Sequence, residues 1–248
     1  MSRYAPQPIQ YSFGPGGITP AVKALIIANV VAFLATMAMP NVMITLFGLT
    51  PQLIFEQGRV WQVATYLFLH DPQGFGHILF NMLALWMFGV DLERRWGTVA
   101  FAKYYAVTGV GAGAATVLAS LLPFDVSRSM YYVPTIGASG AIYGLLLAWA
   151  LLFPHRRILF MFIFPLPARV AAAIMGAMAF LAAVSGRNSG VAEATHLAGM
   201  LAGWLYLKGP TDFRMEFRYR LTKWRMDRMR RKFGIHKGGR DDWDRHIH

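Results

Sequence analysis

Six long apolar segments constrain this chain more than any other feature of its sequence. A helix that crosses a bilayer needs about 20 mostly apolar residues, because the hydrocarbon core is about 30 Å thick and a helix rises about 1.5 Å per residue. The segments span residues 19–39, 76–90, 99–122, 134–153, 168–184 and 191–208. The second is short for a span, so we expect neighbouring helices to shelter one of its ends. The pattern predicts an all-α, polytopic membrane protein built as a six-transmembrane-helix bundle.

Composition excludes several other classes of protein. Of the 248 residues, 56% are hydrophobic and 15% are charged, whereas an ordinary soluble domain has about 45–50% and about 25%. The chain has no cysteine, which excludes disulfides, thiolate metal sites and a cysteine nucleophile. A cleaved signal peptide is the alternative for residues 21–39, although their apolar run exceeds the usual signal core of about 7–15 residues.

The basic residues lie mainly at one end of the chain. Of the 24 Lys and Arg residues, 13 lie from Lys208 onward, whereas the 12 acidic residues divide equally. Their distribution predicts that both termini are cytoplasmic and that the second, fourth and sixth helices run from outside to inside. We expect a cytoplasmic arm at residues 1–18, a membrane domain at 19–208 and a basic tail at 209–248.

The tail carries apolar residues at roughly helical spacing among its arginines, over residues 212–232. This pattern is typical of a basic amphipathic helix that lies on anionic lipid, so the lipid bilayer is a predicted partner. A solvated charged helix is the alternative. Nucleic acid is not a predicted partner, because a positive segment beside the last span is what membrane orientation already requires.

The connection at residues 40–75 is neither polar nor a clean span. It mixes apolar and aromatic residues with Glu56, Arg59 and Gln62. Because Trp and Tyr favour the headgroup level, we expect an amphipathic element that lies half in the outer interface, beside the second helix.

Polar side chains inside a span are costly and indicate function, and we single out five of them as candidates. All five are on the second, fourth and sixth segments, and His77, Asn81, Ser139 and His196 are within about 8 Å of the outer ends. His77 and Asn81 are four residues apart, as are Ser139 and Tyr143, so each pair shares one helix face. The fifth is His196.

Glycines indicate which helices meet. Gly140 and Gly144 form a small-xxx-small pair on the fourth segment, and Gly199 and Gly203 form one on the sixth. Such pairs let backbones approach closely, which would bring Ser139 within hydrogen-bond distance of His196.

A serine hydroxyl is a weak nucleophile until a base such as neutral imidazole takes its proton. The Ser139 amide at a helix N-terminus, with His77 and Asn81, could donate to the oxyanion of a tetrahedral intermediate. Each residue alone also has a structural interpretation, as a helix hydrogen bonder or a packing residue. We expect no metal and no cofactor, since only Glu193 supplies a carboxylate at this level.

These residues together resemble the rhomboid family of intramembrane serine proteases, of the bacterial six-helix type. The matching pieces are Gly137-Ala138-Ser139-Gly140 with Tyr143 and Gly144, His77-Ile78-Leu79-Phe80-Asn81, and His196-Leu197-Ala198-Gly199 with Gly203. Further similar pieces are Trp61 with Thr65, Phe68 and His70, and Glu93-Arg94-Arg95-Trp96-Gly97. The resemblance covers about residues 19–208. It implies a rhomboid-like membrane domain with an interfacial first loop.

The resemblance also implies roles for the residues. Ser139 would be the nucleophile and His196 the general base, as a dyad without a carboxylate. His77, Asn81 and the Ser139 amide would form the oxyanion hole, and Tyr143 would orient the His196 ring. The expected substrates are single-pass membrane proteins, cut near the outer face of a bacterial inner membrane.

Two residues depart from the family pattern. Thr195 stands where a small residue is usual, and we expect little effect from it. Gln62 follows Trp61 where many members have Arg, so the way in which the first loop anchors in lipid does not carry over.

The alternatives to a protease are a non-catalytic rhomboid-like protein that binds membrane helices and a small transporter or channel. We also expect residues 185–190 to cap the site and the fifth helix to act as a lateral gate.

Overall fold

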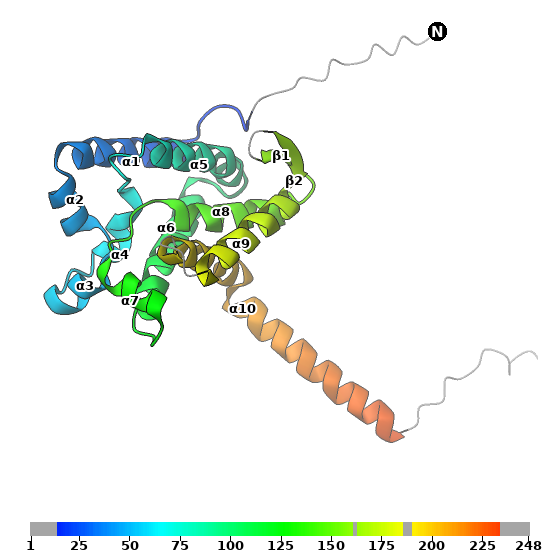
Figure 1. Ribbon diagram of the computed structural model, residues 1–248. Coiled ribbons are helices and arrows are strands. Elements are labelled where there is room, and N and C mark those ends of the chain that lie inside the picture. Colours follow the sequence, from blue (N-terminus) through cyan, green and yellow to red (C-terminus); the bar gives the residue numbers. More distant parts are fainter. Residues whose placement is uncertain (1–13, 161–162, 186–189, 234–248) are drawn as a thin grey trace, which may run out of the picture. The chain divides into compact units, whose positions relative to one another are not determined.

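The computed structural model describes residues 14–160, 163–185 and 190–233, and it is mainly helical (Figure 1). The chain divides into two compact units, Met1–Leu207 and Lys208–His248. The elements are α1 (Pro20–Ala38), α2 (Pro40–Phe47), α3 (Pro51–Gln57), α4 (Gln62–Thr65), η1 (Tyr66–Phe68), α5 (Phe75–Trp96), α6 (Thr98–Ala119), α7 (Asp125–Tyr132), α8 (Ser139–Leu152), β1 (Arg157–Phe160), β2 (Phe164–Pro167), α9 (Ala168–Val184) and α10 (Gly190–Phe233).

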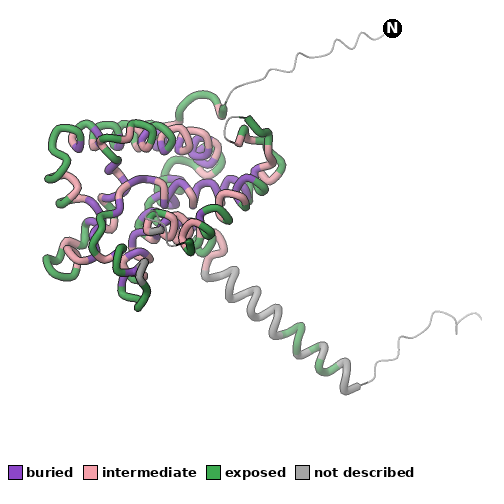
Figure 2. The backbone as a smooth tube through the Cα atoms, in the orientation of Figure 1, coloured by how far each residue is buried: buried purple, intermediate pink, exposed green. Residues whose placement is uncertain are grey.

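Helix α8 is the centre of the first unit. It packs against α5, α6 and α9, and most of its length is buried (Figure 2). A helix that is apolar all round needs such an environment. The residues at the two ends of α8 are therefore held in place by three neighbouring helices.

Helix α8 begins later than predicted, at Ser139 rather than near Pro134. The preceding residues are drawn away from helical geometry by the first loop. Thr135 pairs with Leu49 through two backbone hydrogen bonds of 3.0 and 2.9 Å, and the Gly137 amide donates to the Tyr66 carbonyl at 3.0 Å. Ser139 thus becomes the first residue of a 14-residue helix.

Helix α5 corrects the prediction of a short second segment, because it has 22 residues and continues to Trp96. The apolar criterion ended the segment at Val90, before the charged residues Asp91 and Glu93. Both acidic side chains have partners, so the helix continues without an unpaired charge. Glu93, which is 3% exposed, accepts hydrogen bonds from the Thr19 and Thr98 hydroxyls and from the amides of Ala21 and Val22.

Those bonds place a carboxylate at the N-terminus of α1, where helix amides lack partners and negative charge is favoured. Thr19 occupies the N-cap position, but its hydroxyl makes no capping bond to its own helix. The cap comes instead from Glu93, which joins α1 to the junction of α5 and α6.

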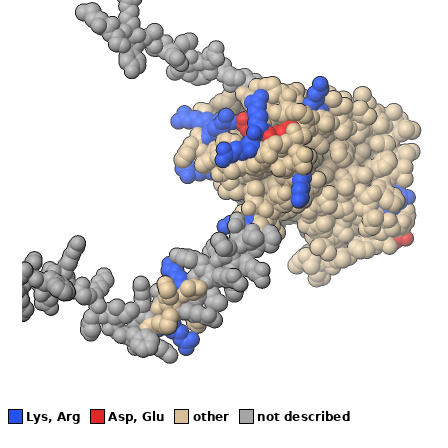
Figure 3. All heavy atoms as spheres, turned by 180° about the vertical axis from the view of Figure 1, so that it is seen from behind, with Lys and Arg blue, Asp and Glu red and all other residues tan. Residues whose placement is uncertain are grey.

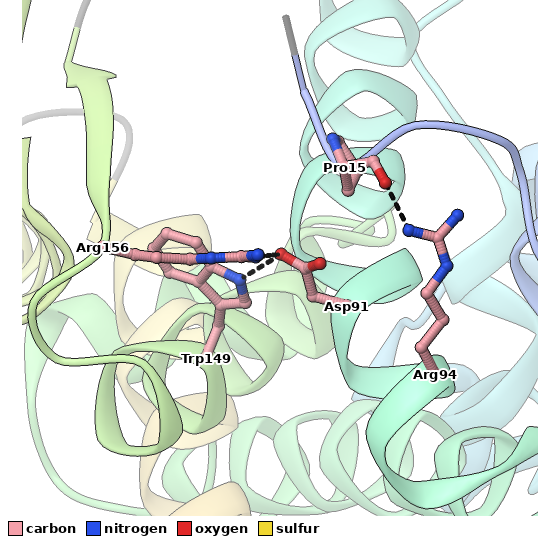
Figure 4. A network of polar contacts seen from close by, with 5 residues as sticks. All are labelled: Pro15, Asp91, Arg94, Trp149 and Arg156. Atoms are coloured by element: carbon pink, nitrogen blue, oxygen red, sulfur yellow. Dashed lines mark hydrogen bonds and ion pairs between the residues drawn. The ribbon is translucent and has the colours of Figure 1, made fainter. Parts of the chain in front are cut away.

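A second polar network closes the end of α8 that is opposite Ser139 (Figure 4). Asp91 accepts a hydrogen bond from the Trp149 indole at 3.0 Å and pairs with Arg156. On the other side of α5, the Arg94 guanidinium donates to the carbonyl of Pro15. On the face seen in Figure 3, Lys and Arg side chains gather around acidic atoms in one region, and most of the remaining surface is uncharged.

The first loop is a set of short helices, α2, α3, α4 and η1, rather than one amphipathic element. Its short helices pack chiefly on α6 and α1, and near its end His70 lies beside α5, with its ring 5.0 Å from that of His77. The Tyr66 hydroxyl donates to the Gly109 carbonyl of α6 at 2.8 Å. Gln62 is fully buried within the first loop. Its side-chain oxygen accepts a hydrogen bond from the Thr50 amide at 3.1 Å, and its side-chain nitrogen donates one to the Thr45 carbonyl at 3.0 Å.

The prediction of an all-α chain was wrong at one place. Strands β1 and β2 form an antiparallel pair in which Arg157 faces Pro167 and Phe160 faces Phe164. Branched and aromatic residues such as Ile158 and Phe160 favour extended backbone. The pair connects α8 to α9, whose bounds of 168–184 agree with the prediction.

Two helices among the described residues are long and apolar enough to cross a membrane, namely α1, with mean hydropathy 2.0 over its best window, and α5, with 1.4. Helices α8 and α9 are apolar but shorter. Large apolar side chains are exposed on α1 and α9, among them Val31, Leu34, Phe180 and Leu181. Such surfaces suit contact with lipid chains.

Helix α10 is interrupted at Gly209, whose backbone (φ 60°, ψ 158°) is not helical. Residues of α10 up to Leu207 belong to the first unit and include His196. After the break the backbone is helical to Phe233, which includes the segment 212–232 that was predicted to be an amphipathic helix. Its placement on lipid stays a prediction.

Candidate active site

Ser139 and His196 meet although 57 residues separate them in the chain. The Ser139 Oγ lies 2.7 Å from the His196 Nε2. Ser139 starts α8, whereas His196 is in the second turn of α10. A hydroxyl and an imidazole at this distance can exchange a proton directly.

The glycines explain how the two helices come so close. A Cβ added to Gly199 would lie 1.9 Å from the Gly140 carbonyl oxygen, and one added to Gly144 would lie 3.1 Å from the Gly199 carbonyl oxygen. On Gly203 it would lie 2.4 Å from the Tyr104 hydroxyl of α6. All four predicted packing glycines therefore lie where α8, α10 and α6 are in contact.

Thr195 adds a polar contact that the sequence reasoning discounted. Its hydroxyl shares a hydrogen bond of 2.8 Å with the Thr116 hydroxyl of α6, and both side chains are buried. The bond fixes the rotation of α10 one residue before His196. The expectation that Thr195 has little effect on the site stays a prediction.

Tyr143 lies against the face of the His196 ring. The ring centroids are 4.3 Å apart and the planes are inclined by 4°. Because Tyr143 stands one turn after Ser139 on α8, the residue that carries the hydroxyl and the residue that stacks on the imidazole share one rigid helix. The stack restricts the plane of the imidazole while leaving its ring nitrogens free to bond.

His77 lies close to the segment that leads into Ser139. A Cβ added to Gly137 would be 2.9 Å from the His77 Nε2 and 3.6 Å from the Ser139 Oγ. Gly137 also has a φ of +123°, which side chains rarely permit. Glycine is therefore required here both by the backbone and by the approach of His77.

The two ring nitrogens of His77 have different environments. Its Nδ1 accepts a long hydrogen bond of 3.4 Å from the Asp71 amide. In a neutral imidazole the nitrogen that does not accept carries the proton. The Nε2 of His77 is then a donor, and it faces the segment that leads into Ser139.

Asn81 is buried one turn below His77. Its side-chain amide donates to the His77 carbonyl at 3.0 Å, which uses one of its two N–H groups. The Ser139 amide is at the start of α8, where N–H groups have no partner within the helix. The His77 Nε2 thus lies beside Gly137, two residues before Ser139, and the Ser139 amide stands at the start of α8.

Glu193 is the residue that sequence reasoning missed. Its Oε2 lies 3.0 Å from the His196 Nδ1, and the two side chains are 23% and 14% exposed. The sequence does hold a signal, since Glu193 and His196 are three residues apart and share a helix face. The expected dyad without a carboxylate therefore has a carboxylate within hydrogen-bond distance.

His70 is fully buried beside the site, with its ring centroid 5.0 Å from that of His77. Burial, and to a smaller extent the neighbouring His77, lowers the pKa of His70 to about 4. His70 thus stays neutral at neutral pH and adds no charge beside His77.

Other expectations concern the entrance. Most of the predicted cap, 186–189, is outside the described residues. Helix α9 packs against α8, and a Cβ added to Gly176 would lie 3.5 Å from the Met200 sulfur. The role of α9 as a lateral gate stays a prediction. Within the described ranges, no group of three or more His, Asp or Glu side chains is placed to hold a metal ion.

Comparison with known proteins adds an independent line of observation. A family model described as the Rhomboid domain matches residues 57–209. The chain is 37% identical over 135 residues to Rhomboid protein 1, mitochondrial, of Saccharomyces cerevisiae, which covers 54% of this chain and 38% of that protein.

Two bacterial proteins are also similar. Identity to Rhomboid protease GluP of Bacillus subtilis is 32% over 159 residues, or 64% of this chain and 27% of that one. Identity to Rhomboid protease AarA of Providencia stuartii is 28% over 176 residues, or 64% and 59%. The chain spans less than two thirds of the length of each of these three relatives.

Proposed function

Because this chain belongs to the rhomboid family, whose members are embedded in membranes, we propose that it is an intramembrane serine endopeptidase with Ser139 as nucleophile and His196 as general base. The observation that carries the proposal is the 2.7 Å contact between the Ser139 Oγ and the His196 Nε2. The proteins named as rhomboid proteases among its relatives support the same reaction class.

In the first step the Ser139 Oγ attacks a substrate carbonyl carbon while its proton moves to the His196 Nε2. The tetrahedral intermediate collapses to an acyl-enzyme as the same proton passes to the leaving amine. Water then attacks the ester, again with His196 as base, and restores Ser139. The Tyr143 stack keeps the ring in place through both steps.

The oxyanion of the intermediate needs donors that are in place before the reaction. The His77 Nε2, the second N–H of the Asn81 side chain and the Ser139 amide are the proposed set. Support comes from the position of the His77 Nε2 beside Gly137, from Asn81 one turn after His77 on α5, and from the positive end of the α8 dipole at Ser139. This set requires no metal and no cofactor.

The short length of α8 supports cleavage below the membrane surface. Its 14 residues rise about 21 Å, which is about 9 Å less than the hydrocarbon core. With the Asp91 and Arg156 network at the inner interface, Ser139 would lie about 9 Å below the outer one. We propose six spans, cytoplasmic termini and a bacterial inner membrane as the location.

The proposed substrates are single-pass membrane proteins cut near the outer face. A peptide bond within a helix is shielded by its own hydrogen bonds, so the substrate must unwind before attack. Small or helix-weakening residues near the cleaved bond lower the cost of unwinding. The carbonyl can then reach Ser139.

Fluorophosphonate labelling tests the proposal. The purified protein, Ser139→Ala and His196→Ala are treated in detergent, and cleavage of a model single-span substrate is measured in parallel. We expect labelling and cleavage of the wild type only, because the probe reacts with an activated serine. Glu56→Gln, a change on the exposed surface of α3, is the control for handling.

Cleavage that survives Ser139→Ala would overturn the proposal. Folded wild-type protein that neither labels nor cleaves would favour the alternative, a rhomboid-like protein that binds membrane helices without cutting them. Ser139 and His196 would then form a structural hydrogen bond.

A further inference from the structure

We propose that the Glu193 carboxylate is a positioning residue for His196, so that the site works as a Ser139–His196–Glu193 arrangement rather than as a dyad. The inference rests on the proposed function and deepens it. It follows from the two hydrogen bonds of one imidazole, 3.0 Å from Nδ1 to the Glu193 Oε2 and 2.7 Å from Nε2 to the Ser139 Oγ.

The identity of the acceptor fixes the proton on the ring. An ionised carboxylate can only accept a hydrogen bond, so the His196 Nδ1 must carry the hydrogen that points to Glu193. In the neutral ring the Nε2 is then the acceptor, and the Ser139 hydroxyl must donate to it. This is the one tautomer in which His196 can act as a base toward Ser139.

The geometry also restricts the ring. Glu193 stands three residues before His196 on α10, so the Nδ1 bond spans one turn of the same helix. Tyr143 of α8 stacks on the ring face at 4.3 Å. One contact stops the ring from turning about its side-chain bonds and the other stops it from tilting, so the Nε2 stays directed at Ser139.

The proton balance of the reaction stays closed. When the Ser139 Oγ bonds to the substrate carbon, its proton forms the second N–H of His196, and the imidazolium is paired with a carboxylate that remains ionised. That proton leaves with the amine when the peptide C–N bond breaks. Glu193 exchanges no proton and forms no covalent bond.

Kinetics of Glu193 variants test the role. We expect Glu193→Gln to lower kcat by about tenfold, the effect of one partly exposed charge-assisted hydrogen bond, with KM changed less than about twofold. Glu193→Asp, which keeps the charge, should recover more than half of the lost rate. Glu56→Gln, the same change on exposed α3, should leave kcat unchanged.

A second measurement does not depend on turnover. Nitrogen-15 spectra of histidine-labelled protein report which ring nitrogen carries the proton, and the His196 signals are identified by their loss in His196→Ala. We expect a protonated Nδ1 in the wild type and in Glu193→Asp. Glu193→Ala should instead give a mixture of tautomers at the same pH.

Each outcome decides between separate claims. A Glu193→Gln protein with wild-type kcat, or an unchanged tautomer in Glu193→Ala, overturns the positioning role while Ser139→Ala can still abolish cleavage. Cleavage that persists in Ser139→Ala would overturn the proposed function, and the tautomer spectra would still test the contact itself. A Glu193 variant with a raised KM and an unchanged kcat would also contradict a positioning role.

Discussion

At the scale of single residues, the candidate site is bordered by one position that cannot hold a side chain and by one buried histidine that stays uncharged. Gly137 lies between His77 and Ser139 with a left-handed backbone. His70 is sealed beside His77 with a pKa lowered to about 4. Both residues act on the donor side of the site without belonging to the reacting pair.

We expect Gly137→Ala to reduce cleavage by about tenfold or more, because the new methyl group would displace the His77 ring and strain the backbone. Gly97→Ala is a matched control, since Gly97 has a φ of +84° but nothing within 4 Å of its added Cβ. It should lose stability of about 1–3 kcal/mol and keep its kcat. Equal loss of kcat in the two variants would contradict the contact with His77.

His70 predicts a loss of stability in mild acid. Its pKa in the folded protein is about 4, below the ordinary value of 6.5, so the unfolded chain binds a proton more readily. The neutral His70 makes its full contribution to the free energy of unfolding above about pH 6.5. This free energy falls as the pH drops toward 4, by about 2 kcal/mol between pH 7 and 5. Unfolding in detergent should show this fall in wild type.

The same titration in His70→Leu should fall less, because leucine fills the site without a charge. His155→Gln, a change of an exposed histidine, should follow the wild-type curve. A His70→Leu protein with the wild-type pH dependence would mean that other groups cause the fall.

At the scale of helices, the reacting pair is set by the contact between α8 and α10. Gly199 faces the Gly140 backbone with no room for a methyl group, since the added Cβ would lie 1.9 Å from a carbonyl oxygen. Backbone atoms cannot turn aside as a flexible side chain can. Any larger residue at Gly199 must move the whole of α10, and His196 with it.

Gly199→Ala should therefore reduce labelling and cleavage by about 10²-fold, as a misplacement of about 1 Å does. Gly176→Ala is the matched control, because its added Cβ would meet only Met200 at 3.5 Å, an ordinary contact. The extent of fluorophosphonate labelling of Gly176→Ala should remain within about twofold of that of the wild type. Similar losses in the two variants would indicate general damage to helix packing.

The sequence predicted most of these helices because apolar length and paired glycines are local signals. Helix α9 was placed at its observed bounds, whereas α5 was ended too early and α8 begun too soon. Those errors arise from distant partners, namely the donors around Glu93 and the pairing of Thr135 with Leu49. The contact of Glu193 was missed because the family pattern expects a dyad, although its spacing from His196 is local.

At the scale of the whole molecule, the described chain forms two units that divide near Gly209. The family match ends at the same residue, and every residue of the candidate site precedes it. More than half of the basic residues follow Leu207. Chemistry and positive charge are thus carried by different parts of the chain.

A protein truncated after Gly209 should keep its kcat in detergent, because every residue of the candidate site precedes the removed segment. In vesicles, its binding or activity should lose the dependence on anionic lipid that the basic tail would confer. Comparing neutral vesicles with vesicles that contain anionic lipid measures this difference. Loss of kcat in detergent would contradict the independence of the two units.

The carboxylate of Glu93 has a consequence for biosynthesis. The amides that it caps belong to Ala21 and Val22, more than 70 residues earlier in the chain. During synthesis the ribosome makes the residues of α1 well before it makes the carboxylate that caps them. The N-terminus of α1 can therefore reach its final hydrogen-bonded state only after α5 has been synthesised to Glu93.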